Sequence, residues 1–237
     1  MKYLIASDIH GSAYYCKKLI DQFEMRCADK LILLGDLLYH GPRNSLPLGY
    51  NPAEVAKMLN KIADKIICIK GNCDCEVDQM MLDFPIMAEF AIMPWGNKTI
   101  FMTHGHKYGA DAVEGYYKAM AAYKAAIENG EPAVKPNSIP AIATGDVLLQ
   151  GHTHQSVYYT MECGVINVNP GSVSISKGGG SCGFMTFEDG VFVRYDMDGR
   201  EERKYEIETK AESDDEATDS ATPNATEEKT ENGDSNE

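Results

Sequence analysis

The sequence has no long apolar run, and its basic side chains are outnumbered by acidic ones. Apolar stretches such as residues 31–34 and 66–69 fall far short of the roughly 20 residues that a membrane-spanning helix needs. Lys and Arg number 22 against 36 Asp and Glu, which gives a formal net charge of −14. Because non-specific nucleic-acid binding and attraction to anionic membranes both depend on Lys and Arg, we expect neither a large nucleic-acid surface nor a membrane partner.

A secretion signal and a cysteine framework are also missing. The apolar run at residues 3–6 leads directly into Ser7 and Asp8, so it is too short for the hydrophobic part of a signal peptide. Seven cysteines are an odd number at irregular spacing, which favours reduced thiols over disulfides. Cys73 and Cys75 have no second thiol pair at zinc-finger spacing, so a structural zinc site is not expected. These features predict a cytoplasmic protein.

The last 27 residues lack any Val, Ile, Leu, Met, Cys or aromatic side chain. Residues 211–237 carry ten acidic side chains and one lysine, a net charge of −9, which leaves −5 on residues 1–210. A segment with so little apolar surface cannot offset the entropy lost on ordering. We therefore predict a folded domain over residues 1–210 and a disordered acidic tail over residues 211–237.

The first third of the chain alternates apolar and amphipathic segments. Short apolar runs lie at residues 2–7, 30–35 and 65–71, and amphipathic stretches at residues 12–25 and 51–63 separate them. The second amphipathic stretch opens with an Asn-Pro pair suited to the start of a helix. This order predicts a buried parallel sheet with helical crossovers, whose active site lies beyond the carboxyl ends of the strands.

The rest of the chain has a different pattern. Residues 87–103 predict two short strands around a turn at residues 94–98, and an insertion at about residues 111–144 contains apolar side chains at helical spacing. That helix should end at Asn129 and Gly130. Several short β-like segments follow residue 146, and they predict an antiparallel sheet.

The six histidines all fall in short loop strings. With the string at residues 71–74 they make five loops, most of them directly after a predicted strand: D-x-H at residues 8–10, G-D at 35–36, G-N-C-D at 71–74, H-G-H at 104–106 and G-H-T-H at 151–154. Residues two apart in an extended segment point to the same side. Seven nitrogen and oxygen donors at one sheet edge predict a metal site.

The donor types limit which metals could be bound. Imidazole, carboxylate and amide donors suit Mn, Fe, Zn or Ni, whereas Ca or Mg would be held almost entirely by oxygen. Two carboxylates and four imidazoles are too many for one open catalytic ion. Two ions that share a carboxylate use the set naturally, and such pairs serve phosphoryl transfer.

The ordered strings resemble the calcineurin-like metallophosphoesterases and, within them, the YfcE-type phosphodiesterases. The matching segments cover the chain from the first strand to about Tyr205, and they are SDIHGS (7–12), LGDLLYHGPRN (34–44), GNCDCEVDQM (71–80), THGH (103–106), GHTH (151–154) and NPGSVSISKGG (169–179). The resemblance implies an α/β/β/α fold with two packed mixed sheets flanked by helices.

The resemblance also assigns the metal ligands. It places Asp8, His10, Asp36 and His154 around one ion, and it makes Asp36 a bridge to a second ion held by Asn72, His104 and His152. Mn is the metal that it favours, and the donor chemistry leaves Fe, Zn and Ni open. The implied reaction is hydrolysis of a phosphodiester by a hydroxide bridging two divalent ions, without a covalent enzyme intermediate.

Four further side chains lie beside this set. Many family members have a His directly after the ligand Asn, where it can protonate the leaving group, and this chain has Cys73, as the YfcE-type pattern does. Arg43, after a Gly-Pro turn, could clamp a phosphate or simply pair with a surface acid. His40 and His106 adjoin ligands and could line the pocket or orient them.

The residues are compatible with three functions: a phosphodiesterase, a phosphomonoesterase and a non-catalytic scaffold. A thiol is a poor general acid, which argues against an alternative phosphomonoesterase. A non-catalytic scaffold of this fold is the other alternative, and the seven competent ligand positions argue against it. The insertion at residues 111–144 keeps a partner-binding role or a homo-oligomer contact open. We therefore predict a small phosphodiester as the substrate, of an identity that the ligands do not specify.

Overall fold

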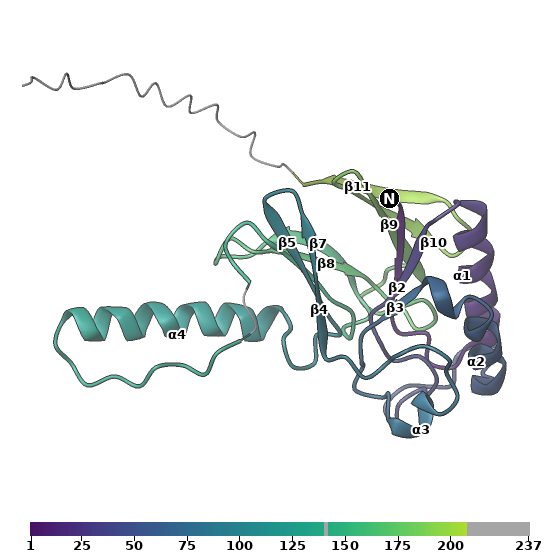
Figure 1. Cartoon of the computed structure of the whole chain (residues 1–237), viewed down its shortest axis with the longest axis horizontal. Helices are drawn as coiled ribbons and strands as arrows, with labels where there is room; N and C mark the ends of the chain where they lie inside the picture. Colours follow the sequence, from purple (N-terminus) through teal and green to yellow (C-terminus); the bar gives the residue numbers. More distant parts are fainter. Residues whose placement is uncertain (140–141, 208–237) are drawn as a thin grey trace, which may run out of the picture.

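The computed structural model describes residues 1–139 and 142–207, and two mixed β-sheets lie face to face at its centre (Figure 1). The first sheet has the order β11-β10-β9-β1-β2-β3, and the second has the order β4-β5-β6-β8-β7. The strands of the first sheet are β1 (Tyr3–Ala6), β2 (Lys30–Leu33), β3 (Ile66–Cys68), β9 (Gly183–Glu188), β10 (Val191–Asp196) and β11 (Glu201–Glu206). Those of the second are β4 (Phe90–Trp95), β5 (Lys98–Thr103), β6 (Val147–Leu149), β7 (Ser156–Thr160) and β8 (Ile166–Pro170).

Side chains on alternate positions of the central strands of the first sheet fill two separate cores. Ile5 and Ile32 point between the sheets, where they pack with Met102 and other apolar side chains of the second sheet. Their neighbours Leu4 and Leu31 point to the opposite face and pack beneath the helices. This alternation is the period of a β-strand, and it explains why the central strands are apolar at every position.

The predicted strand and helix alternation at the start of the chain is confirmed. Strand β1 pairs in parallel with β2, and β2 pairs in parallel with β3. Helices α1 (Ala13–Met25) and α2 (Pro52–Asn60) connect these strands and cover the outer face of the first sheet (Figure 1). The Asn51 side chain accepts a hydrogen bond from the Glu54 N–H at 3.2 Å, so it caps α2 as expected. A 3₁₀ turn, η1 (Ala63–Lys65), and a one-turn helix, α3 (Glu76–Gln79), complete this part.

The prediction of one antiparallel sheet after residue 146 is wrong. In the second sheet β6 pairs in parallel with both β5 and β8. Strands β9, β10 and β11 instead join the first sheet, where β9 pairs antiparallel with β1. Short apolar strands carry no information about which sheet they join, because both sheets offer the same buried inner face. The two mixed sheets implied by the family resemblance are nevertheless present.

The turn predicted at residues 94–98 is shorter than expected. Strand β4 continues through Pro94 to Trp95, so only Gly96 and Asn97 make the turn to β5. Strand β4 lies at the edge of its sheet, and an edge strand tolerates a proline because one side of its backbone has no ladder partner.

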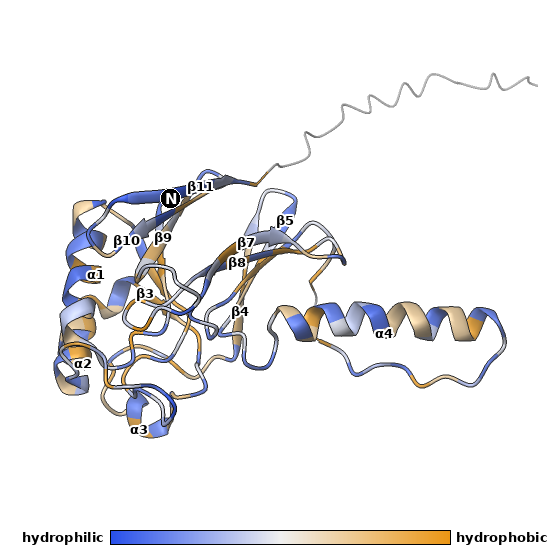
Figure 2. Cartoon of the chain, turned by 180° about the vertical axis from the view of Figure 1, so that it is seen from behind, coloured by the Kyte–Doolittle hydropathy of each residue, from blue (hydrophilic) through white to orange (hydrophobic). Residues whose placement is uncertain are grey.

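The predicted helix in the insertion is confirmed as α4 (Ala110–Glu128), which ends before Asn129 and Gly130. Its first two turns cover the outer face of the second sheet, where Val113 packs with Phe101 and Leu148. The remainder projects from the sandwich, with apolar and polar residues mixed along it (Figure 2). Ile127 is 54% exposed there, so the apolar face expected from its spacing is only partly buried.

Two expectations concern residues that the structure does not describe. The predicted boundary at residue 210 and the predicted disordered tail, residues 211–237, lie outside the described residues, as do residues 140 and 141 of the insertion. Within residues 1–139 and 142–207, no helix combines the length and the apolar character needed to cross a membrane.

Candidate metal centre

The five predicted loops meet at one edge of the sandwich. Each follows the carboxyl end of a strand: β1, β2 and β3 of the first sheet, and β5 and β6 of the second. The loops bring together all seven predicted ligand side chains, which are Asp8, His10, Asp36, Asn72, His104, His152 and His154. The first sheet supplies the two carboxylates and the amide, and the second supplies three of the four imidazoles.

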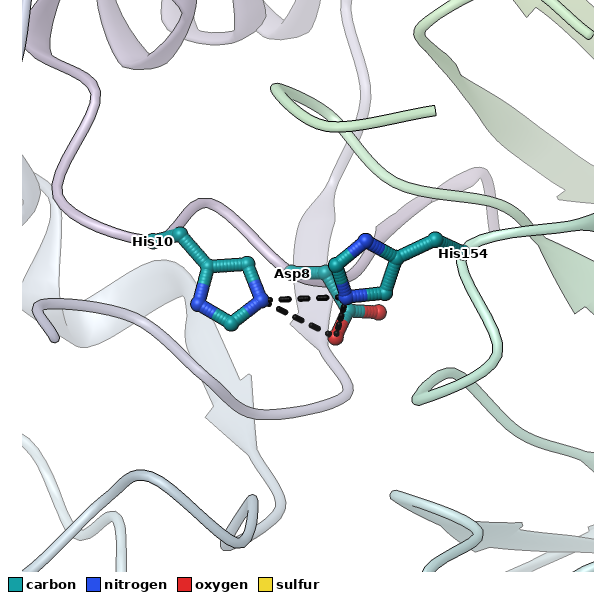
Figure 3. Close-up of side chains that lie close together, drawn as sticks. All are labelled: Asp8, His10 and His154. Carbon is teal, nitrogen blue, oxygen red and sulfur yellow. Dashed lines mark hydrogen bonds and ion pairs between the residues drawn. The ribbon is translucent and has the colours of Figure 1, made fainter. Parts of the chain in front are cut away.

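Asp8 lies between two of the imidazoles (Figure 3). Its Oδ1 atom is 3.6 Å from His10 Nε2 and 3.3 Å from His154 Nε2, and the two Nε2 atoms are 3.1 Å apart. All three side chains are buried. Within the described part of the chain, this set is one of the groups whose donor atoms all lie within 4.8 Å of one another.

Asp36 lies between this group and the remaining donors. Its Oδ2 atom is 3.7 Å from His10 Nε2 on one side and 3.4 Å from His104 Nε2 on the other. His104 Nε2 in turn lies 3.1 Å from Asn72 Oδ1 and 3.2 Å from His152 Nδ1. Asp36 thus occupies the position that a carboxylate shared by two cations would need.

Backbone carbonyls fix the orientation of three imidazoles. The Nδ1 atoms of His10, His104 and His154 lie 2.8, 2.6 and 2.6 Å from the carbonyl oxygens of Tyr39, Leu34 and Ile175, respectively. A carbonyl can only accept, so each Nδ1 carries a proton, and Nε2 is the ring nitrogen left to bind a metal once it is deprotonated. Metal-binding histidines are commonly held in this way.

The charges of the site are consistent with a cation. Burial would raise the pKa of Asp8, yet contacts with His10 and His154 hold it well below its ordinary value. Burial likewise opposes ionisation of Asp36, and the contact with His104 lowers its pKa. Asp8 Oδ1 is inaccessible and has no hydrogen-bond partner among the described residues. A buried, ionised oxygen without a hydrogen-bond partner, beside the Nε2 atoms of two imidazoles, is satisfied by a metal ion. The residues therefore fit the expected group.

The ligand loops have an unusual backbone. Five of the seven non-glycine residues with positive φ among those described are predicted ligands, namely Asp8, His10, Asp36, His152 and His154, with φ between 50° and 66°. The idea that Asp8 and His10 leave an extended segment is therefore wrong, because the loop turns at each of them. Left-handed residues of this kind cost about 1–3 kcal/mol each and are concentrated at functional sites.

Asp74 is a positioning residue to which the sequence assigned no role. Its carboxylate accepts hydrogen bonds from the backbone N–H groups of Asp36 at 2.8 Å, Leu37 at 2.9 Å and Gly71 at 2.7 Å. Asp74 thereby ties the loop that carries Asp36 to the loop that carries Asn72. The only signal in the sequence was its place in the G-N-C-D string, which indicates no supporting role.

A second support comes from the segment at residues 169–179. The hydroxyls of Ser172 and Ser174 donate to the Asp8 carbonyl at 2.8 and 3.2 Å, and the Asn169 amide donates to the Gly151 carbonyl at 2.7 Å. The segment thus holds the loops of both Asp8 and His152. The resemblance included it, but its residue types alone indicate no such contact.

Cys73 and Arg43 face the metal centre, whereas His40 does not. The two side chains line a cleft of about 500 Å³ together with Asp36, Asn72, His152 and His154. Burial and the nearby Asp36 raise the pKa of the Cys73 thiol to about 12, so it is uncharged at neutral pH. The His40 ring instead packs edge-on against Tyr39 and Tyr50.

His106 lies next to the centre rather than in it. Its ring centroid is 5.4 Å from that of His104 and 6.1 Å from that of His152, and it lines a neighbouring cleft of about 450 Å³. Burial and the adjacent His104 lower its pKa.

The chain is similar to known phosphoesterases over most of its length. Residues 1–190 match the Calcineurin-like phosphoesterase superfamily domain. Phosphodiesterase YfcE of Escherichia coli (strain K12) is 40% identical over 191 residues, which cover 81% of this chain and 89% of that protein. The structure of YfcE, a phosphoesterase from E. coli, superposes with a TM-score of 0.73 at 36% identity and covers 88% of this chain and 100% of that one.

More distant structures share the fold. Vps29 from Entamoeba histolytica, solved in complex with Zn²⁺, has a TM-score of 0.52 at 18% identity and covers 88% of this chain and 100% of its own. The two mixed sheets flanked by helices are thus the shared architecture. From its sequence match and its fold, the chain belongs to the calcineurin-like phosphoesterase superfamily.

Proposed function

We propose that this protein is a phosphodiesterase that hydrolyses a small phosphodiester with the help of two divalent metal ions. The observation that carries the proposal is the position of Asp36 between two groups of donors, one on each side of its carboxylate. Asp8, His10 and His154 would hold one ion with Asp36, and Asn72, His104 and His152 would hold the other. The similarity to Phosphodiesterase YfcE supports the choice of a phosphodiester.

The bound ions would supply the chemistry of attack. If held by these residues, the ions would activate a water nucleophile near neutral pH and would offset negative charge on the phosphoryl group. We propose Mn as the metal, and the imidazole-rich donor set is equally compatible with Fe, Zn or Ni.

The protein's own residues hold and orient these groups. The carbonyls of Tyr39, Leu34 and Ile175 fix three imidazoles, and Asp74 fixes the loop of the shared carboxylate. Arg43 lies on the wall of the cleft, where its guanidinium can bind a phosphoryl oxygen. Preorganisation of this kind removes the cost of arranging charges during the reaction.

Cys73 favours a diester over a monoester. The Cys73 backbone N–H donates to Asp36 Oδ1 at 2.7 Å, so its side chain lies directly beside the centre. A thiol with a pKa of about 12 gives up a proton poorly. Substrates with poor leaving groups, such as alkyl phosphomonoesters, would therefore react slowly, which argues against the alternative phosphomonoesterase. The complete donor set argues against a purely scaffolding role.

The substrate class and the cellular location are also proposed. We propose a small phosphodiester as the substrate, and the cytoplasm as the location because all seven cysteines are free thiols. The projecting helix α4 is the element on which a homo-oligomer contact would be sought.

The test compares two substrates that share a leaving group. Purified protein loaded with Mn²⁺ is assayed with bis(p-nitrophenyl) phosphate and with p-nitrophenyl phosphate. We expect a higher kcat/KM for the diester and loss of both activities in Asp36→Ala. A clear preference for the monoester would support the phosphomonoesterase, and no turnover of either ester would favour the scaffold.

A further inference from the structure

The cleft at the metal centre continues into a second hollow. This second hollow has a volume of about 590 Å³ and is lined by Lys177, Ser181, Arg194 and Arg203 together with the glycines at residues 178–180. Gln155 and Lys177 line both this hollow and the cleft that contains Asp36. A ligand bound at the metal centre can therefore extend past Lys177 into the second hollow.

The second hollow is positively charged. Three basic side chains, those of Lys177, Arg194 and Arg203, line it, and Glu202 is the one acidic side chain among its lining residues. This concentration of positive charge is notable because residues 1–210 carry a net charge of −5. Positive charge, opposite in sign to the net charge of the domain, is therefore concentrated where a substrate can reach it.

Arg194 fixes one of these charges in the wall. It is 1% exposed, and its guanidinium donates to the carbonyls of Ser181 at 2.8 Å and Phe184 at 3.5 Å and to the Ser156 hydroxyl at 3.2 Å. These acceptors are uncharged, and Arg194 Nη1 is 3.7 Å from the nearest carboxylate oxygen, on Glu202. The ion pair with Glu202 offsets part of the charge of Arg194, and with Lys177 and Arg203 the hollow still has three cationic side chains against one carboxylate.

Lys177 connects the hollow to the metal centre. Its backbone N–H donates to the His154 carbonyl at 3.1 Å, so the loop that carries it is anchored to a predicted ligand. Its side chain is exposed and lies where the two clefts join. It can therefore contact a group attached to a phosphoryl group bound at the centre.

The neighbouring cleft that His106 lines has a different character. It is lined by Ala112, Val157 and Tyr159, and its lysine, Lys107, is paired with Glu89. Asp111 also lines it, so its charges are balanced. An uncharged substituent suits that cleft, and an anionic one suits the second hollow beside Lys177.

We propose that the second hollow binds a second phosphate group of the substrate, so that the preferred substrates are phosphodiesters that also carry a terminal phosphate. The proposal rests on the proposed phosphodiesterase function, because the metal centre must hold the scissile group. Lys177 and Arg203 would contact the terminal phosphate directly, and Arg194 would add its charge from the wall. Contacts of this type are strong because both partners are charged.

The test uses two substrates that differ by one phosphate. The Mn²⁺-loaded full chain is assayed with thymidine 3′-(p-nitrophenyl phosphate) and with the same compound bearing a 5′-phosphate. We expect about tenfold higher kcat/KM for the 5′-phosphorylated compound, mainly through a lower KM, and a smaller ratio at high salt because exposed charges are screened. Lys177→Gln should bring this ratio close to one. Lys57→Gln, a change at an exposed lysine of α2, should leave the ratio as it is.

A binding measurement separates the two proposals. Calorimetry compares the affinity of the protein for thymidine 3′,5′-bisphosphate with that for thymidine 3′-phosphate, in the wild type and in Lys177→Gln. Tighter binding of the bisphosphate that is lost in Lys177→Gln supports the second site even if neither ester is turned over, in which case only the phosphodiesterase proposal fails. Equal affinities, or equal effects of Lys177→Gln and Lys57→Gln, would overturn the second site even if both esters are hydrolysed.

Discussion

Hydrogen bonds to backbone carbonyls fix the orientation of single histidine rings at the centre, so that Nε2 of each ring points to the proposed metal position. His104 shows this most clearly, because its Nδ1 is held by the Leu34 carbonyl while its Nε2 faces Asp36, Asn72 and His152. The residue types of the seven donors could be predicted from their positions in loops after strands. The supports could not, because Asp74 and Ser172 act through backbone groups that a sequence pattern does not identify.

The charge state of His104 makes the stability of the metal-free protein depend on pH. Burial alone would lower the pKa of His104, but the contact with Asp36 raises it to about 9, above the ordinary value of 6.5. A pKa raised in the folded state stabilises the fold below pH 6.5, and this contribution is lost as pH rises from 6.5 through 9. We expect the metal-free protein to lose on the order of 2 kcal/mol of unfolding free energy over that range, measured by urea denaturation.

The same measurement with metal should show the opposite trend. Metal binding requires His104 to be neutral, so Mn²⁺ should stabilise the protein more at pH 8 than at pH 6.5. His104→Gln should flatten most of the metal-free dependence. A metal-free protein that gains stability between pH 6.5 and 9 would show that this interpretation of His104 is wrong.

We propose that Cys73, in place of a histidine, limits the protein to substrates with good leaving groups. Replacing its thiol by an imidazole in Cys73→His would add a general acid beside Asp36, which can contribute about 10²-fold or more to a reaction limited by proton transfer. We expect a larger gain in kcat/KM for alkyl phosphomonoesters than for aryl diesters, measured by phosphate release. Cys75→His, at an exposed position nearby, is the control. No gain on monoesters would count against the role given to Cys73.

At the scale of elements, the centre depends on how closely two loops approach. A Cβ atom on Gly71 would lie 2.1 Å from Asp36 Oδ1 and 2.3 Å from the Asp36 backbone nitrogen. Only a glycine lets the loop after β3 pack against the loop after β2. The sequence indicated a glycine near each ligand loop, and the structure shows which contact requires it.

Gly71→Ala should therefore separate the two loops and move the shared carboxylate. A displacement of about 1 Å at a reacting group can cost about 10²-fold in rate, so we expect at least that loss of kcat/KM together with weaker Mn²⁺ binding. Gly115→Ala on α4 has open space around its Cβ and should keep full activity and gain about 0.5–1 kcal/mol of stability. Equal activity of the two variants would contradict the close approach.

The order of the first strands and helices could be predicted from the sequence, whereas the sheet that each later strand joins could not. The strand and helix order at the start of the chain followed from clear periodicity and a good cap at Asn51, and it is confirmed. The assignment of later strands to sheets was wrong because β9 pairs with β1, nearly the whole length of the domain away in sequence. Helix α4 was predicted, but its projection from the sandwich depends on contacts of its first turns that composition does not reveal.

At the scale of the whole molecule, the net charge divides into parts with different effects. Most of the −14 belongs to residues 211–237, while three basic side chains of the described domain line the second hollow. The low positive charge argues against large nucleic-acid partners. It does not argue against a small phosphodiester, because the proposed metal ions and the local cluster of Lys177, Arg194 and Arg203 would supply the attraction.

Removing residues 211–237 should leave catalysis nearly unchanged. These residues contain no Val, Ile, Leu, Met, Cys, His or aromatic side chain, and the charges that they carry are screened beyond about 10 Å at 0.1 M salt. We expect kcat/KM of the shortened chain to stay within about twofold of the full chain at that ionic strength. A larger loss would show that the acidic segment contributes to the site.

The central claim is that two metal ions sharing Asp36 hydrolyse a phosphodiester. It is tested most directly by titrating Mn²⁺ into the metal-free protein while following hydrolysis of bis(p-nitrophenyl) phosphate. Activity should rise until two ions are bound per chain, and Asp36→Ala should remain inactive at every Mn²⁺ concentration. Full activity at one ion per chain, or hydrolysis by Asp36→Ala comparable to that of the wild type, would contradict the claim.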